Sequence, residues 1–194
     1  MSIFTIIIII AVLAALWLIG LYNNLVKKNI HVDEAWSDID VQLKRRYDLI
    51  PNLIETVKGY AAHESQVLQS VISARSKASS MDIDLKNASA EQMAEFSAAQ
   101  DGLSGALGKL FALSEAYPDL KANENFLELQ KEISDTENKI QAARRFYNAT
   151  VRALNTAILS FPANLIAHKF GFSSREFFDL SDAPEERENV KVSF

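Results

Sequence analysis

Hydrophobic residues divide the chain into one uninterrupted apolar segment and a longer, periodic remainder. From Ile3 to Tyr22 nearly every residue is apolar, and the first charged residue is Lys27. As a helix, with a rise of about 1.5 Å per residue, this segment covers about 30 Å, the thickness of a hydrocarbon core. Trp17 and Tyr22 fit the interfacial belt at its C-terminal end. We therefore predict a membrane span from Ile3 to Tyr22, within an anchor of residues 1–26.

A cleaved signal peptide is the alternative interpretation of the same segment. It requires a basic region before a shorter apolar core and small residues at the cleavage site. Here no Lys or Arg precedes the apolar core, the core is too long, and residues 20–23 (GLYN) are a poor cleavage site. The pattern favours a retained anchor.

The charges beside the span predict its orientation. Lys27 and Lys28 follow the span directly, and no basic residue precedes it. Loops rich in Lys and Arg stay on the cytoplasmic side of a membrane. We expect residues 27–194 to lie in the cytoplasm, with a stub of two residues outside.

Beyond the span, apolar residues recur at helical spacing in four stretches, residues 32–50, 53–78, 90–116 and 119–160. Pro51 either kinks one long helix or separates two. Ser89 and Gln92 fit a capping box, and the last stretch is nearly a strict heptad, as in a coiled coil. A short amphipathic helix at 162–170 is expected to end at Gly171. The fold class is therefore all-α: an N-terminal transmembrane helix followed by an antiparallel four-helix bundle with long helices, over residues 27–172.

Two further segments depart from this regular pattern. Gly102, Gly105 and Gly108 lie in the third stretch, where we expect them to permit close approach of a neighbouring helix in preference to forming a ligand-binding loop. Residues 173–194 carry an excess of acidic residues, Pro184 and no lasting periodicity, so we expect an acidic, flexible C-terminal tail. The alternation in residues 190–194 also fits a docked strand.

Composition and motifs argue against several function classes. The net charge of −5 does not suit a nucleic-acid binder, and the lack of cysteine excludes disulfides and thiolate sites. The sequence has no Glu-x-x-His motif, zinc-protease helix motif or glycine-rich phosphate loop. We therefore expect no catalytic residue, metal site, cofactor or small-molecule substrate. His63 is better explained as a polar neighbour of the core than as a catalytic residue.

Polar residues within or beside the apolar stripes have two competing interpretations. They either form hydrogen bonds and ion pairs between helices, which buried polar groups require, or make an interaction surface. We favour the structural role for Glu137, Asn148 and Asn155, and solvated or membrane-proximal charge for residues 44–46. The candidate residues are Gln42, Arg45, Arg46, Asp48, Asn52, Glu55, Glu64, Glu137, Arg144, Asn148 and Asn155.

Two long blocks, Asp40–Glu64 and Tyr117–Asn155, carry a resemblance to a known family. The first reads DVQLKRRYDLIPNLIETVKGYAAHE, and the second contains ENKIQAARRFYNATVRALN. Both resemble the LemA family of bacterial membrane proteins. The resemblance implies a four-helix bundle behind a single span of the bacterial inner membrane, with a short N-terminus outside. It implies no catalysed reaction.

These observations predict a membrane-anchored, non-catalytic scaffold or adaptor that self-associates or binds other membrane proteins. The near-heptad fourth helix favours a homo-oligomer, and small residues Ala11, Ala14 and Ala15 permit close packing of spans. Confinement to the bilayer raises the effective concentration of copies. A transmembrane signalling component is the alternative, and an enzyme using His63 and Glu64 ranks last.

Overall fold

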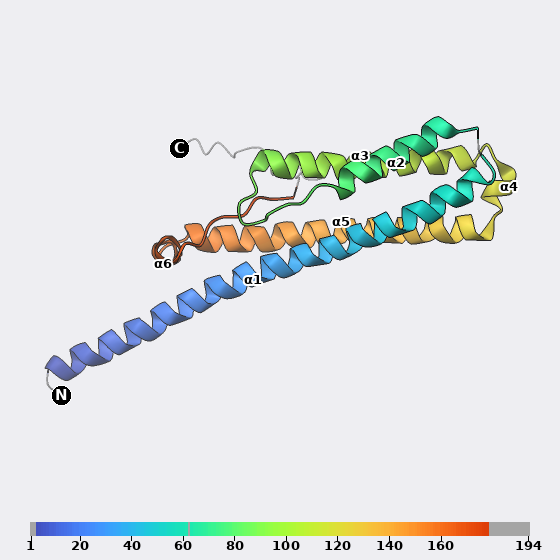
Figure 1. The fold of residues 1–194 in the computed structure, drawn as a ribbon. Helices are drawn as coiled ribbons and strands as arrows, with labels where there is room; N and C mark the ends of the chain where they lie inside the picture. The colour runs from blue at the N-terminus through green and yellow to red at the C-terminus, as the bar shows by residue number, and fades with distance from the viewer. Residues whose placement is uncertain (1–2, 62, 179–194) are drawn as a thin grey trace, which may run out of the picture.

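The computed structural model describes residues 3–61 and 63–178 of the chain, and these residues form six helices and no strand. The all-α prediction is confirmed. Figure 1 shows a long rod that leads into an elongated bundle. In the bundle the helices α1 (Ile3–Lys58) and α5 (Glu124–Leu159) lie along one another, and α2 (Ser65–Ser79) and α3 (Ala90–Ser114) lie above them.

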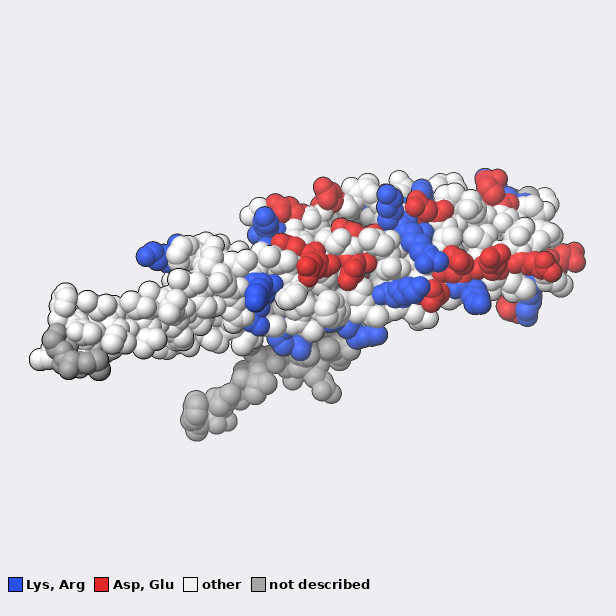
Figure 2. All heavy atoms as spheres, turned by 90° about the horizontal axis from the view of Figure 1, so that it is seen from below, with Lys and Arg blue, Asp and Glu red and all other residues white. Residues whose placement is uncertain are grey.

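Helix α1 joins the apolar segment to the bundle without a break. Its 56 residues correspond to about 84 Å of helix. Side chains of residues 3–20 are exposed throughout, as expected for a segment surrounded by lipid, and α1 is the one helix of the described chain that is long and apolar enough to cross a membrane. Figure 2 shows this rod without any charged side chain on the visible face.

Pro51 lies inside α1 and does not separate two helices. A proline in a helix has no N–H, which leaves the carbonyl four residues earlier without its usual donor. Here Arg75 of α2 supplies that donor, because its Nε donates to the Tyr47 carbonyl at 2.8 Å. Helix α1 instead ends at Lys58 and α2 begins at Ser65, so that the apolar stretch 53–78 is divided between α1 and α2.

Local capping residues define the remaining helices. The predicted capping box at α3 is present, since Ser89 Oγ accepts from the Gln92 backbone N–H and Gln92 Oε1 accepts from the Ser89 N–H. The expected helix 119–160 is two elements, α4 (Pro118–Lys121) and α5, because Asn123 caps α5 by accepting from the Phe126 N–H at 2.9 Å. Helix α6 (Ala163–Phe170) ends at Gly171, whose φ is 74°.

The apolar heptad stripe of α5 is buried in the core of the bundle. Ile133, Ile140, Tyr147 and Leu154 are buried, and α5 packs mainly against α1. One apolar cluster fills the end of the bundle that is remote from the span. A second cluster, which is rich in aromatic residues and contains Trp36, lies nearer to the span. The seam that favoured self-association is therefore occupied within the chain.

The expected close approach at Gly102, Gly105 and Gly108 is wrong. All three residues are exposed on α3, and a Cβ added at any of them meets no atom within 4 Å beyond its own helical surroundings. The glycines face outward, because the inward positions of α3 are occupied by larger residues such as Leu103 and Leu107.

Replacing Gly105 with alanine is expected to raise the free energy of unfolding by about 0.5–1 kcal/mol. Alanine lowers the conformational entropy of the unfolded chain and has the higher helix propensity. Urea denaturation of the full chain in detergent micelles, followed by circular dichroism, measures this change. Gly171→Ala is the matched control and should destabilise, because its φ of 74° is unfavourable for a residue with a Cβ. A less stable Gly105→Ala variant would contradict the exposed placement.

Candidate functional site

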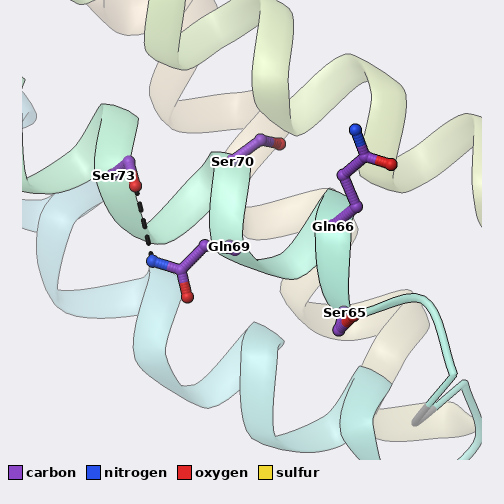
Figure 3. Close-up of a pocket in the computed structure, with 5 residues that line it drawn as sticks. All are labelled: Ser65, Gln66, Gln69, Ser70 and Ser73. Atoms are coloured by element: carbon purple, nitrogen blue, oxygen red, sulfur yellow. Dashed lines mark hydrogen bonds between the residues drawn. The ribbon is translucent and has the colours of Figure 1, made fainter.

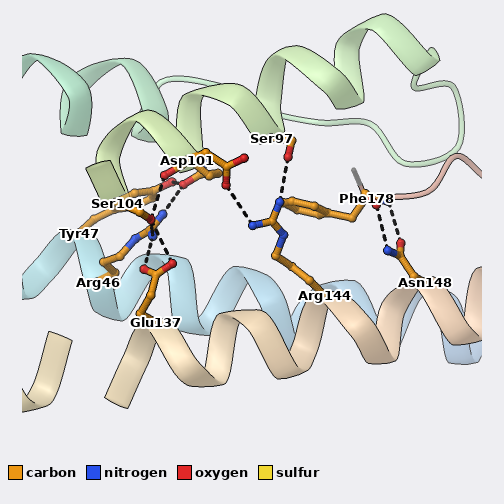
Figure 4. A network of polar contacts seen from close by, with 10 residues as sticks. Arg46, Tyr47, Ser97, Asp101, Ser104, Glu137, Arg144, Asn148 and Phe178 are labelled. Atoms are coloured by element: carbon orange, nitrogen blue, oxygen red, sulfur yellow. Dashed lines mark hydrogen bonds and ion pairs between the residues drawn. The ribbon is translucent and has the colours of Figure 1, made fainter. Parts of the chain in front are cut away.

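Arg46 is the centre of a polar network that joins three helices (Figure 4). Its side chain is 1% exposed, and its Nη1 donates to Glu137 Oε2 of α5 at 2.6 Å. The same guanidinium donates to Ser104 Oγ at 3.0 Å and to Gln100 Oε1 at 2.6 Å, both on α3. The expectation of solvated charge at residues 44–46 thus fails for Arg46, which fixes the positions of α1, α3 and α5 relative to one another.

The network continues through two neighbouring side chains. Ser104 Oγ also donates to Glu137 Oε1 at 3.0 Å, and the Tyr47 hydroxyl donates to Gln100 Oε1 at 2.9 Å. Burial raises the pKa of the Tyr47 phenol, which favours its neutral, donating form. Gln100 Nε2 donates to the carbonyl of Ala78 near the end of α2. The network therefore reaches all four long elements of the bundle.

Arg144 forms a second buried site two turns along α5. Its Nη2 donates to Ser97 Oγ at 2.8 Å, and its Nη1 pairs with Asp101 Oδ1 at 3.1 Å. The guanidinium carbon lies 4.2 Å from the centre of the Phe178 ring, in cation–π geometry. Arg144 thus binds α3 on one side and the C-terminal segment on the other.

Asn148 and Asn155 hold the C-terminal segment against α5. Each side-chain amide makes two hydrogen bonds of 2.9 Å to the backbone of one residue, Asn155 to Arg175 and Asn148 to Phe178. Asn148 and Asn155 are seven helical residues apart, a rise of about 10.5 Å. Arg175 and Phe178 are three extended residues apart, a length of about 10 Å, so the two spacings match. The pairing runs antiparallel to α5.

The side chains of Tyr147 and Arg175 also hold this segment against the bundle. The Tyr147 hydroxyl donates to the Glu176 carbonyl at 3.0 Å, and burial raises the pKa of this phenol. Arg175, itself buried, donates to Asn29 Oδ1 at 2.9 Å and lies 3.6 Å from Asp33 Oδ1. The first six residues of the expected flexible tail are therefore packed onto the bundle. Its remaining residues, 179–194, lie outside the described chain, and so does the alternating stretch 190–194.

The other predicted residues are spread along the surface and the far end of the bundle. Arg45 forms an exposed ion pair with Glu132, and Glu55 forms another with Lys58. Glu64 accepts from the Tyr117 hydroxyl at 2.9 Å. Gln42 is partly buried, whereas Asp48 and Asn52 are exposed.

His63 lies exposed in the turn between α1 and α2 and does not border the core, contrary to expectation. In the described part of the chain, no three His, Asp or Glu side chains are placed to hold a metal ion. A depression of about 440 Å³ on the outer face of α2 (Figure 3) is lined by uncharged Ser and Gln side chains, among them Gln69, whose Nε2 donates to Ser73 Oγ. Its lining offers hydrogen bonds but no acid or base.

The sequence analysis did not identify the α3 residues that bind Arg46 and Arg144. Ser97, Gln100, Asp101 and Ser104 lie at i, i+3, i+4 and i+7, which places them on one face of α3. Apolar residues occupy the neighbouring rows of α3. The helical spacing of the four polar residues was therefore a signal in the sequence that they share one face of the helix. Tyr47 lies at an apolar-stripe position of α1, although its hydroxyl belongs to the polar network.

The model of the LemA family matches residues 35–194 of this chain. The chain belongs to the LemA family. Protein LemA of Metamycoplasma hominis is 31% identical over 175 residues, which cover 90% of this chain and 75% of that protein. Together with the long apolar helix, the family is consistent with a membrane-anchored bacterial protein.

Two magnetosome proteins are more distant relatives. MamQ 2 of Paramagnetospirillum magneticum is 24% identical over 179 residues, or 84% of this chain, and MamQ of Magnetospirillum gryphiswaldense is 24% identical over 174 residues, or 81%. This LemA-family chain spans 66% and 64% of the lengths of these two proteins. The family match contains the Arg46 and Arg144 networks and the segment 173–178.

Proposed function

We propose that this LemA-family chain is a non-catalytic scaffold that is anchored in the bacterial inner membrane and self-associates through its span. The observation that supports this most is the continuity of α1, which passes from the apolar segment to the remote end of the bundle as one helix. A bundle attached through a continuous helix is presented at a defined distance and direction from its anchor. Such a presentation suits assembly with neighbours in the same membrane.

The use of the polar residues supports a structural role for the bundle. Arg46, Glu137 and Arg144 contact other helices, and Asn148 and Asn155 contact the backbone of the C-terminal segment. Their hydrogen-bonding groups are directed at other parts of the same chain. Buried networks of this kind specify one arrangement of helices, which is what a scaffold needs.

The junction of span and bundle supports a cytoplasmic bundle. Lys27 and Lys28 follow the span directly, and α6 packs against this part of α1 and adds Lys169. No acidic residue lies between positions 21 and 32 or between 159 and 172. The excess of lysine at this end of the span agrees with the positive-inside rule.

The span is the surface that we propose for self-association. The heptad stripe of α5 is buried against α1, so it is not available to a second chain. In the span, Ala11, Ala14 and Ala15 share one face of α1, and all are exposed. Small residues on one face let two helices approach closely in lipid, where van der Waals packing drives association.

Cysteine cross-linking in native membranes tests this proposal without background, because the chain has no cysteine of its own. Single variants Ala11→Cys and Ala14→Cys are expected to form disulfide-linked dimers on mild oxidation. Leu13→Cys and Leu16→Cys are matched controls on the opposite face of the same helix turns, and they should cross-link much less. Monomers at all four positions, or equal cross-linking on both faces, would refute association through the alanine face.

A further inference from the structure

Four large apolar side chains are exposed close together in sequence around α6. Leu159 and Phe161 are 73% and 80% exposed, and Leu165 and Phe170 of α6 are 62% and 58% exposed. Helix α6 packs on the bundle through Ile166 and Ala167, whereas Leu165 points away from these two residues and Phe170 lies one turn beyond them, at the last residue of α6. A group of large apolar side chains of this kind on a folded domain marks an interaction surface.

This surface adjoins the end of the membrane span. The rings of Tyr22 and Phe170 meet with centroids 4.9 Å apart. A cleft of about 430 Å³ is lined on one side by Leu18, Ile19 and Tyr22 of α1 and on the other by α6 residues, including Leu165 and Phe170. Leu18 and Ile19 lie in the last turns of the predicted span. The exposed residues of α6 are therefore at the depth where the bilayer ends.

The direction of α6 suits a membrane surface. In Figure 1, α1 and α5 are seen along their length, whereas α6 is seen nearly end-on. Its axis therefore runs across the bundle, close to the plane in which a bilayer surrounding α1 would end. Interfacial helices lie in this plane with their apolar face among the lipids.

The charges around α6 complement anionic lipid. Lys27 and Lys28 follow the span directly on α1, Lys169 lies on α6, and the two segments, residues 21–32 and 159–172, contain no acidic residue. Figure 2 shows basic side chains before any acidic one on passing from the uncharged rod to the bundle. Basic residues beside a membrane attract anionic phospholipid headgroups.

We propose that α6 and residues 159–161 form a second membrane-docking element, which inserts Leu159, Phe161, Leu165 and Phe170 into the leaflet where the span ends, with anionic phospholipids around it. The chain then contacts the bilayer at two places, through the span and through α6. The continuous helix α1 fixes the bundle relative to the span, but span and bundle can still tilt together in the bilayer, and a second attachment through α6 restricts this tilt. This inference requires the anchor but not self-association.

Fluorescence quenching in vesicles tests the docking element with the full chain. Single variants Phe161→Cys and Leu165→Cys carry an environment-sensitive fluorophore, and the vesicles contain phosphatidylcholine and phosphatidylglycerol with a nitroxide on the acyl chains. We expect strong quenching at both positions. Phe146→Cys, at an exposed phenylalanine of α5, is the aqueous control and should be quenched little. Leu13→Cys is the control for the span and should be quenched strongly.

The controls separate failure of the docking element from failure of the anchor. Quenching at Leu13→Cys with none at positions 161 and 165 would refute the docking element alone. No quenching at Leu13→Cys would refute the anchor. A blue-shifted emission at 161 and 165 that the lipid nitroxide does not quench would show that another protein surface covers α6, and would also refute the proposal.

The lipid composition tests the role of the lysines. Quenching at positions 161 and 165 is expected to weaken in vesicles of phosphatidylcholine alone, and Lys169→Gln should reduce the difference between the two compositions. Equal quenching in neutral and anionic vesicles would refute the preference for anionic lipid.

Discussion

Replacing Glu137 with alanine is expected to lower the free energy of unfolding by about 3–5 kcal/mol, because it leaves the Arg46 guanidinium buried without its counter-ion. Arg46 is 1% exposed and Glu137 is 29% exposed, so water reaches the carboxylate more easily than the guanidinium. Urea denaturation of the full chain in detergent micelles, followed by circular dichroism, measures the loss.

Glu132→Ala is the matched control, since it removes the partner of Arg45 from an exposed ion pair on the same two helices. Exposed pairs contribute about 0–1 kcal/mol, so this variant should change stability little. The double variant Arg46→Met with Glu137→Ala should be more stable than Glu137→Ala alone, because the uncompensated charge is gone. Equal losses for Glu132→Ala and Glu137→Ala would contradict the buried network.

Replacing Phe178 with alanine is expected to lower the free energy of unfolding by about 3–5 kcal/mol, the range for removing a large buried aromatic side chain. Phe178 is 1% exposed, and its ring contacts Trp36 and Phe96 at centroid distances of 6.0 and 5.7 Å. Its loss also removes the cation–π contact with Arg144. The same urea denaturation assay measures the change.

Phe146→Ala is the matched control for Phe178, because it is the same substitution at a side chain that is 56% exposed. Substitutions at such surface positions usually change stability by no more than about 0.5 kcal/mol. Limited proteolysis adds a second measurement, since release of residues 173–178 from α5 should expose the segment to cleavage in Phe178→Ala. Unchanged stability and protection would show that this segment does not hold the bundle together.

Much of the fold follows from local patterns. The apolar run of residues 3–22, the capping box of Ser89 and Gln92 and the end of α6 at Gly171 depend on nearby residues, and all three appear in the structure. Even Arg46 carried a signal, because it lies three residues after Leu43 and four before Ile50, at a core position of α1. An arginine at a core position indicates a buried partner, although it does not say which one.

Other features depend on partners remote in sequence. Arg75 completes the helix at Pro51 from a different element, and the periodic pattern of α1 contains no information about it. The outward placement of Gly105 depends on which face of α3 turns to the core. Asn148 and Asn155 are two turns apart on α5, but their spacing alone does not reveal that a later segment is bound there.

By itself, the sequence determined the long apolar N-terminal helix, the helical class and the family, because hydropathy, periodicity and long residue blocks are properties of contiguous chain. The tertiary structure alone decided that the polar residues join helices to one another and to the segment 173–178. It also decided that the heptad of α5 is used internally and that the apolar face of α6 adjoins the end of the span. Each of these depends on contacts between residues far apart in the chain, which become neighbours only when the bundle closes.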